Sequence, residues 1–230
     1  MPNLKRITIV CGHYGCGKTN LSINLAIDCA KAGNTVTLVD LDLVNPYFRS
    51  SEYEDVLKKN QVKLIAPVYA NTTLDLPMLP AELNSIFASS DDHIILDVGG
   101  DDVGSTVLGT ISSKIREAEY DMFYVVNRYR ALTTTAEEAA ELLKEIEAAS
   151  RLKATAVVNN SHLKHLTTAQ DILNSAEFAK NAAEMLNLPL LFTTVPKQIG
   201  SQQIQTLSKI PNLYPIEIYV RSPWEIDVTQ

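Results

Sequence analysis

The chain has 230 residues, of which 46% are hydrophobic and 20% charged; this excludes global disorder and suits a single domain over residues 1–230. A formal net charge of −7 argues against non-specific nucleic-acid binding, which needs a basic surface. The N-terminus lacks the pattern of a signal peptide and no apolar run approaches membrane-spanning length, so we expect a cytoplasmic protein that does not bind membranes.

The first predicted strand, Ile7–Cys11, runs into a segment that fills every fixed position of G-x-x-x-x-G-K-[ST]. Glycines in such a loop let the backbone wrap a phosphate, and successive N–H groups form an anion nest. We expect Lys18 to reach the β- and γ-phosphates and the Thr19 hydroxyl to bind Mg²⁺. Apolar residues at helical spacing predict a helix over Asn20 to Lys31 behind the loop. The predicted nucleotide contacts from this stretch are Gly12, His13, Tyr14, Gly15, Cys16, Gly17, Lys18, Thr19 and Asn20.

Carboxylates end two further predicted strands. A β-branched strand over Thr35–Val39 leads into Asp40 and Asp42, and an apolar strand from His93 ends at Asp97. Carboxylates at the carboxyl ends of parallel strands face the phosphate crevice, so we expect them to serve Mg²⁺ and the attacking water. The alternative is that they make turn hydrogen bonds. Gly99 and Gly100 behind Asp97 would let a mobile loop approach the γ-phosphate.

The middle of the chain alternates predicted helices and strands. Helices are expected over 52–59, 80–89, 104–119 and from Thr134 or Thr135 to 149, with strands over 62–65 and 122–126 and a loop over 66–76. Arg128 and Arg130 follow the last of these strands. We expect them either to contact phosphates or a partner, or to lie in a solvated loop.

The last third predicts strands over 154–158 and 190–194, a helix over 175–187, and an edge strand over 216–220. Asn159 follows the first of these strands, and its amide has both a donor and an acceptor for a base edge. A guanine site usually extends to N-K-x-D, but the sequence from Asn159 has no such aspartate, which favours adenine. We expect Pro196, after the second strand, to wall the base pocket.

Strand, phosphate loop, helix, strand, Asp-x-Asp and a later strand ending in Asp-x-Gly-Gly together resemble the ParA/MinD-like ATPases of the SIMIBI class. That class includes signal-recognition GTPases and dethiobiotin synthetase, and the resemblance runs from about Leu4 to Lys197. It implies a three-layer α/β fold with a mostly parallel sheet and helices on both faces. It also assigns Lys18 and Asp42 as catalytic residues, Thr19, Asp40 and Asp97 as Mg²⁺ ligands, and Asn159 and Pro196 as adenine-pocket residues.

The loop departs from these relatives at one position. They commonly carry a lysine directly after the first glycine, which reaches across a dimer to the partner's nucleotide. This chain has His13 there, which is shorter and mostly neutral at pH 7. Arg49, Arg128 and Arg130 are the candidates to replace the lysine.

The resulting hypothesis is an ATP- and Mg²⁺-dependent hydrolase that acts as a nucleotide switch for an unidentified protein partner, with an ATP-dependent homodimer implied by the resemblance. One alternative is a biosynthetic enzyme of the dethiobiotin-synthetase type that activates a small carboxylate with ATP. The other is a nucleotide-binding module with little turnover.

Overall fold

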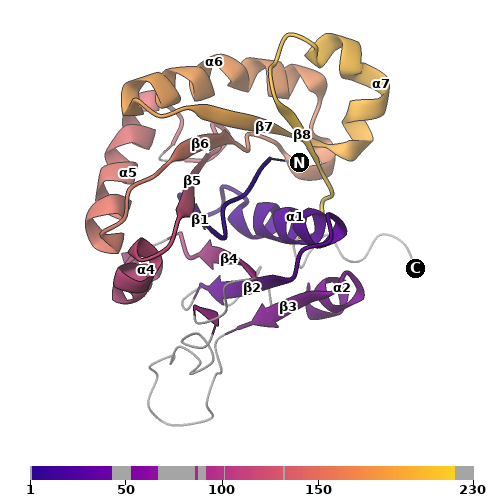
Figure 1. The fold of residues 1–230 in the computed structure, drawn as a ribbon. Coiled ribbons are helices and arrows are strands. Elements are labelled where there is room, and N and C mark those ends of the chain that lie inside the picture. The colour runs from indigo at the N-terminus through magenta and orange to yellow at the C-terminus, as the bar shows by residue number, and fades with distance from the viewer. Residues whose placement is uncertain are drawn as a thin grey trace, which may run out of the picture.

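The computed structural model describes residues 2–42, 53–66, 86–87, 92–100, 102–131 and 133–220, without the side chains of residues 102 and 200–204. Helices and strands alternate along the chain (Figure 1). In chain order they are β1 (Ile7–Cys11), α1 (Lys18–Lys31), β2 (Val36–Leu41), α2 (Glu54–Lys59), β3 (Val62–Ile65), β4 (His93–Val98), α4 (Asp102–Arg116), β5 (Tyr120–Val126), α5 (Ala136–Ser150), β6 (Ala156–Asn159), the 3₁₀ turn η2 (Lys164–Leu166), α6 (Ala169–Leu186), β7 (Leu190–Pro196), α7 (Lys197–Leu207) and β8 (Leu213–Ile216).

The described strands form one eight-stranded sheet in the order β3-β2-β4-β1-β5-β6-β7-β8. Each neighbouring pair among them runs parallel. β1 lies between β4 and β5 in the sheet. The connection after β1 leads to β2 on the β4 side of the sheet, and the connection after β5 leads to β6 in the opposite direction. A crevice at the carboxyl edge of such a sheet is where α/β proteins bind ligands, so the topology directs attention to the loop after β1.

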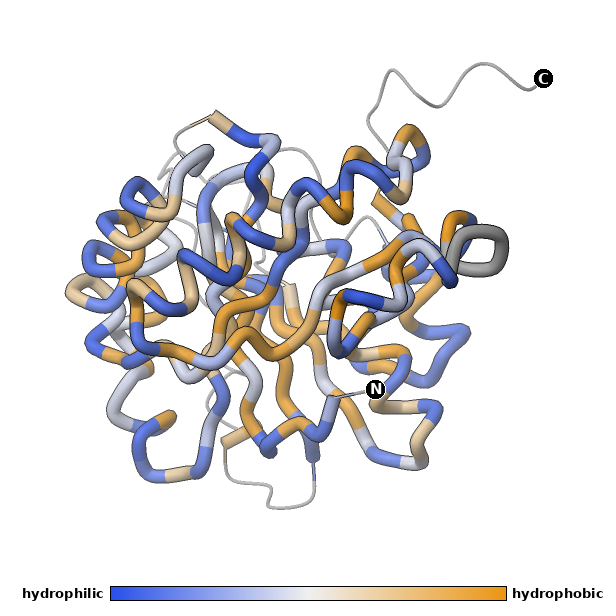
Figure 2. Tube along the Cα trace, turned by 90° about the horizontal axis from the view of Figure 1, so that it is seen from above, coloured by the Kyte–Doolittle hydropathy of each residue, from blue (hydrophilic) through white to orange (hydrophobic). Residues whose placement is uncertain are grey.

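Two apolar layers cover the sheet. Every residue of β1 and β2 is buried, as expected for parallel strands that have helices on both faces. One layer packs α1 and α2 against one face, and the other packs α4, α5 and α6 against the opposite face. The hydrophobic residues accordingly gather in the central strands and the hydrophilic ones on the surrounding helices (Figure 2). The prediction of a three-layer α/β fold is confirmed.

Some predicted boundaries are wrong. Helix α6 begins at Ala169 and not at Ser175, because Thr168 and Asp171 form a capping box six residues earlier. The final strand is Leu213–Ile216, and residues 217–220 are not a strand. The loop over 66–76 lies outside the described residues except for Ala66, and the helix over 80–89 except for residues 86–87. Among the described residues, no helix has the length and hydropathy needed to cross a membrane.

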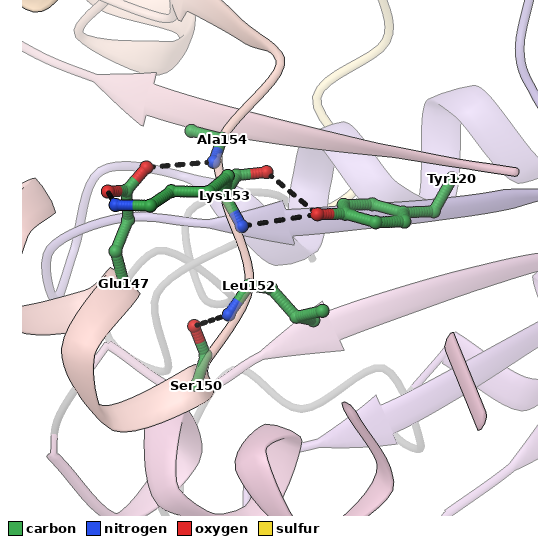
Figure 3. A network of polar contacts seen from close by, with 6 residues as sticks. All are labelled: Tyr120, Glu147, Ser150, Leu152, Lys153 and Ala154. Atoms are coloured by element: carbon green, nitrogen blue, oxygen red, sulfur yellow. Dashed lines mark hydrogen bonds and ion pairs between the residues drawn. The ribbon is translucent and has the colours of Figure 1, made fainter. Parts of the chain in front are cut away.

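The turn from α5 to β6 is held by polar contacts (Figure 3). The carboxylate of Glu147 accepts from the backbone N–H of Ala154 at 3.0 Å and pairs with the ammonium of Lys153. The Tyr120 hydroxyl, at the start of β5, accepts from the Lys153 N–H at 3.2 Å. These contacts fix where β6 starts, and therefore where the residues after its carboxyl end lie.

Candidate functional site

The loop between β1 and α1 surrounds the start of the helix, and Lys18 lies at its centre. The side chain of Lys18 is buried, and its Nζ donates to the carbonyl oxygen of His13 at 3.0 Å, across the loop. The loop after β4 approaches closely, because a Cβ placed on Gly100 would lie 2.8 Å from Lys18 Nζ and 2.5 Å from the backbone nitrogen of Tyr14. Only glycine fits at position 100. Lys18, His13 and Gly100 therefore lie together in the structure.

Asn160 supports the loop through its side-chain amide. Its Nδ2 donates to the carbonyl oxygen of Cys16 at 2.7 Å, and its Oδ1 accepts from the hydroxyl of Thr194 at 2.6 Å. All three side chains are buried. Burial also raises the pKa of the Cys16 thiol, which keeps it protonated, and Cys16 packs in the same apolar layer as α1. Sequence reasoning missed Asn160; its only signal is a second asparagine after a predicted strand.

Asp40 and Asp97 are neighbours on adjacent strands. They are register partners in β2 and β4, so their side chains lie on the same face of the sheet, towards α1. Each is 1% exposed. Asp97 Oδ1 accepts from the hydroxyl of Ser22 in α1 at 3.2 Å, and Asp40 Oδ1 accepts from the backbone N–H of Asp42 at 3.0 Å. The bonds to Ser22 and Asp42 agree with the turn-bonding alternative, and the shared face agrees with the metal-binding one.

This donor set suits Mg²⁺. The ion prefers oxygen ligands and is commonly held by one or two carboxylates together with substrate phosphates and water. Asp40 and Asp97 supply the carboxylates, and Thr19 is the second residue of α1, on the face of the sheet to which they point. Within the described residues no group of three or more His, Cys, Asp or Glu side chains could hold a metal without a ligand's help.

Asn159 is fully buried and makes its hydrogen bonds within the protein. Its Nδ2 donates to the Ser175 hydroxyl at 2.9 Å, and its Oδ1 accepts from the Ser161 N–H at 3.2 Å. A base edge would have to replace one of these partners. Pro196 is buried at the end of β7, directly before α7. The adenine contacts of these two residues stay predictions.

The residues that could replace the lysine found in relatives at position 13 lie in different places. His13 Nδ1 is 2.9 Å from the Tyr14 carbonyl oxygen within its own loop. Arg128 turns away from the loop, donates to the carbonyl oxygen of Asn174 in α6, and lines an open cavity of about 600 Å³ between α5 and α6. Arg130 lies against the loop, its Nε 3.7 Å from a Cβ placed on Gly15. Arg49 lies outside the described residues.

Comparisons with known proteins agree with this geometry. The model of the family described as the CobQ/CobB/MinD/ParA nucleotide binding domain matches residues 7–184. Comparison with curated protein sequences gives no match.

Several solved structures share the fold. FtsY from Thermotoga maritima superposes with a TM-score of 0.58 at 18% identity, covering 85% of this chain and 63% of that one. FtsY from Mycoplasma mycoides gives 0.55 at 16% identity over 82% and 59% of the two chains. The signal recognition particle 54 kDa protein from Aeropyrum pernix, solved in complex with GDP, gives 0.55 at 15% identity over 84% and 42%. The chain thus spans less than two thirds of the length of each of these structures.

Proposed function

The chain belongs to the CobQ/CobB/MinD/ParA nucleotide-binding domain family, and on that basis we propose that it is an Mg²⁺-dependent ATPase that acts as a nucleotide switch for a partner protein. The observation that carries the proposal is the meeting of three elements at one edge of the sheet. Buried Lys18 starts α1, the neighbouring carboxylates of Asp40 and Asp97 lie one residue before the ends of β2 and β4, and Gly100 lies against Lys18.

Each residue has a role in this proposal. The backbone N–H groups of Gly12–Thr19 and the ammonium of Lys18 hold the β- and γ-phosphates, for which Lys18 exchanges its contact with the His13 carbonyl. Thr19, Asp40 and Asp97 hold Mg²⁺, which when bound neutralises charge on the phosphates. Asp42, directly after β2, orients the water for in-line attack on the γ-phosphate.

The close approach of Gly100 to Lys18 supports the proposed switch. We expect a triphosphate bound beside Lys18 to move the residues that follow β4. Loss of the γ-phosphate lets those residues return. A partner, or a second copy of this chain, that contacts them in only one of the two positions reads the state of the nucleotide.

ATP is proposed over GTP because the loop after β6 lacks the aspartate of N-K-x-D. The structural neighbour in complex with GDP makes GTP the ligand to test against ATP. A small carboxylate substrate is the second ligand to test, since an activating enzyme would release phosphate only when that substrate is present.

The test removes Lys18. We expect Lys18→Ala to weaken ATP–Mg²⁺ binding by about 10- to 100-fold, because one charge-assisted hydrogen bond to a phosphate contributes roughly 1.5–3 kcal/mol. Isothermal titration gives the affinities for ATP and GTP, and a phosphate-release assay, with and without small carboxylates, gives turnover.

Lys31→Ala is the matched control, because it removes the same charge from the exposed last turn of the same helix. It should bind as the wild type does. Equal affinities of Lys18→Ala and the wild type would overturn the proposal, and so would a wild-type protein that binds no nucleoside triphosphate.

A further inference from the structure

Two buried side-chain donors without a partner flank the phosphate loop. Among the described residues, Arg130 Nε and His162 Nε2 are buried nitrogen atoms that make no hydrogen bond. Arg130 lies beside Gly15, and His162 lies beside Gly17, its Nε2 4.0 Å from a Cβ placed on that glycine. Leaving a buried donor unsatisfied costs free energy, so two of them at one loop indicate an absent acceptor.

His162 is held as a neutral donor. Its Nδ1 accepts from the backbone N–H of Lys164 at 3.1 Å, which leaves the ring proton on Nε2. Burial, with the positive charges of Arg130 and Lys164 nearby, lowers the pKa of His162 to about 4. At neutral pH the ring therefore points an uncharged N–H at the side of the loop, where it can serve only as a donor.

The loop after β5 fixes where Arg130 lies. Asn127 Oδ1 accepts from the backbone N–H of Tyr129 at 3.0 Å, and the Asn127 carbonyl accepts from the Arg130 N–H at 3.1 Å, closing a turn. The Arg128 N–H donates to the Ser161 hydroxyl at 3.0 Å, joining this turn to the loop that carries His162. Arg130 and His162 therefore lie on two linked loops on the same side of Gly15–Gly17.

We propose that Arg130 and His162 bind the phosphate chain of the nucleotide within one subunit, adding a cation and a neutral donor to those of the loop itself. This rests on the proposed nucleotide binding and names further residues of that site. A phosphate oxygen is the acceptor that fits, because both side chains can only donate hydrogen bonds here. Lys18 and the N-terminus of α1 also make this site electropositive, although the chain as a whole has a net negative charge. Arg130 is the one of the two described candidate arginines that lies against the loop.

The decisive variant is Arg130→Gln, compared with Arg128→Gln as the matched control on the same loop. We expect Arg130→Gln to weaken ATP–Mg²⁺ binding by about 10- to 100-fold and to reduce the dependence of affinity on salt. Arg128→Gln, which loses its contact with α6, should stay within about twofold of the wild type. Isothermal titration at two salt concentrations measures both, and thermal unfolding shows that each variant is folded.

The second variant addresses His162. His162→Leu should weaken binding about 5- to 10-fold, whereas His162→Gln, which keeps a side-chain donor, should lose less. If His162→Leu does not fold, His162→Asn takes its place, as an amide too short to reach the same point.

The outcomes separate this inference from the proposed function. A wild type that binds ATP, together with equal affinities of the Arg130→Gln and Arg128→Gln variants, would overturn the inference alone. A wild type that binds no nucleotide overturns the proposed function. The titrations are run at a protein concentration at which gel filtration shows a monomer. If Arg130→Gln weakened binding only at higher concentrations, at which the protein is a dimer, binding within one subunit would be contradicted.

Discussion

Asn160 leaves no room for a side chain at Gly17. The φ of this glycine, 89°, lies in the left-handed region, and a Cβ there would lie 2.4 Å from Asn160 Nδ2. That nitrogen donates to the Cys16 carbonyl, so a side chain at position 17 both strains the backbone and pushes away the group that holds the loop. Gly33 also has a left-handed φ, of 92°, but nothing lies within 4 Å of its Cβ position.

These two glycines separate backbone strain from crowding. We expect Gly33→Ala to lower the free energy of unfolding by about 1–2 kcal/mol through its backbone alone. Gly17→Ala should cost roughly 2–5 kcal/mol, because it adds a broken buried hydrogen bond, and it should also weaken nucleotide binding. Urea unfolding compares the two variants. Equal costs would mean that Asn160 moves aside freely and does not hold the loop.

At the scale of single residues, the sequence predicted the residues that a motif places at a fixed spacing. It missed the residues whose role comes from contacts that form only in the folded chain. Lys18 and Asp97 stand at set positions relative to a strand and a loop: Asp97 is the register partner of Val10 in β1, and Lys18 begins the helix after the loop that follows β1. Asn160 and His162 act through contacts with residues more than 100 positions away, which no local pattern reports. Asn159 has the expected place, but its amide binds neighbours that only the fold supplies.

At the scale of elements, side-chain caps decide where α5 and α6 begin. Thr135 caps α5, accepting from the N–H of Glu138 at 3.2 Å, while the Glu138 carboxylate accepts from the N–H of Thr134 at 2.9 Å. The predicted start at Thr134 or Thr135 is confirmed. The start of α6 lies six residues before the predicted one, where Thr168 and Asp171 form a capping box.

The cap of α5 predicts a dependence of stability on pH. Hydrogen bonds from Thr134 and Thr135 lower the pKa of Glu138 below its ordinary value of 4.5, so the folded state favours the ionised carboxylate. Its contribution to stability is therefore complete above pH 4.5 and is lost as the pH falls through the lowered value. We expect Glu138→Gln to destabilise the protein at neutral pH, with a difference from the wild type that shrinks below pH 4.5.

Urea unfolding from pH 7 to pH 3 measures that difference. Glu141→Gln removes a carboxylate of the same helix beyond its first turn, and we expect a smaller effect from it. A difference for Glu138→Gln that grows as the pH falls would contradict the assignment of the cap.

At the scale of the molecule, the order of the strands is what the sequence did not predict. Buried parallel strands such as β1 and β2 are uniformly apolar, and nothing in such a run says which strand lies beside it. The alternation over 216–220 suggested an edge strand, but β8 ends at Ile216 and the residues after it bind α1. Asn20 and Asn24 replace a neighbouring strand there by bonding the backbone of residues 217–220.

Asn24 thus joins the end of the described chain to the helix that starts at the phosphate loop. Its Oδ1 accepts from the N–H of Glu217 at 2.8 Å, and its Nδ2 donates to the Glu217 carbonyl at 2.9 Å, as a paired strand would. We expect Asn24→Ala to lower the free energy of unfolding by about 1–3 kcal/mol, since it leaves the N–H of Glu217 without its partner, whereas the Glu217 carbonyl keeps the bond from Asn20. Hydrogen exchange should accelerate at residues 217–220 and not in β1 or β4.

Asn34→Ala is the control for that variant, because the side-chain amide of Asn34 donates to the Cys29 carbonyl near the end of α1, within the same part of the chain. It should leave exchange at 217–220 unchanged. If Asn24→Ala accelerated exchange equally throughout the sheet, the 217–220 segment would unfold only with the whole molecule, and Asn24 would contribute to global stability alone. Local acceleration would instead show that the segment is held to α1 chiefly by side-chain amides, separately from the pairing of β7 with β8.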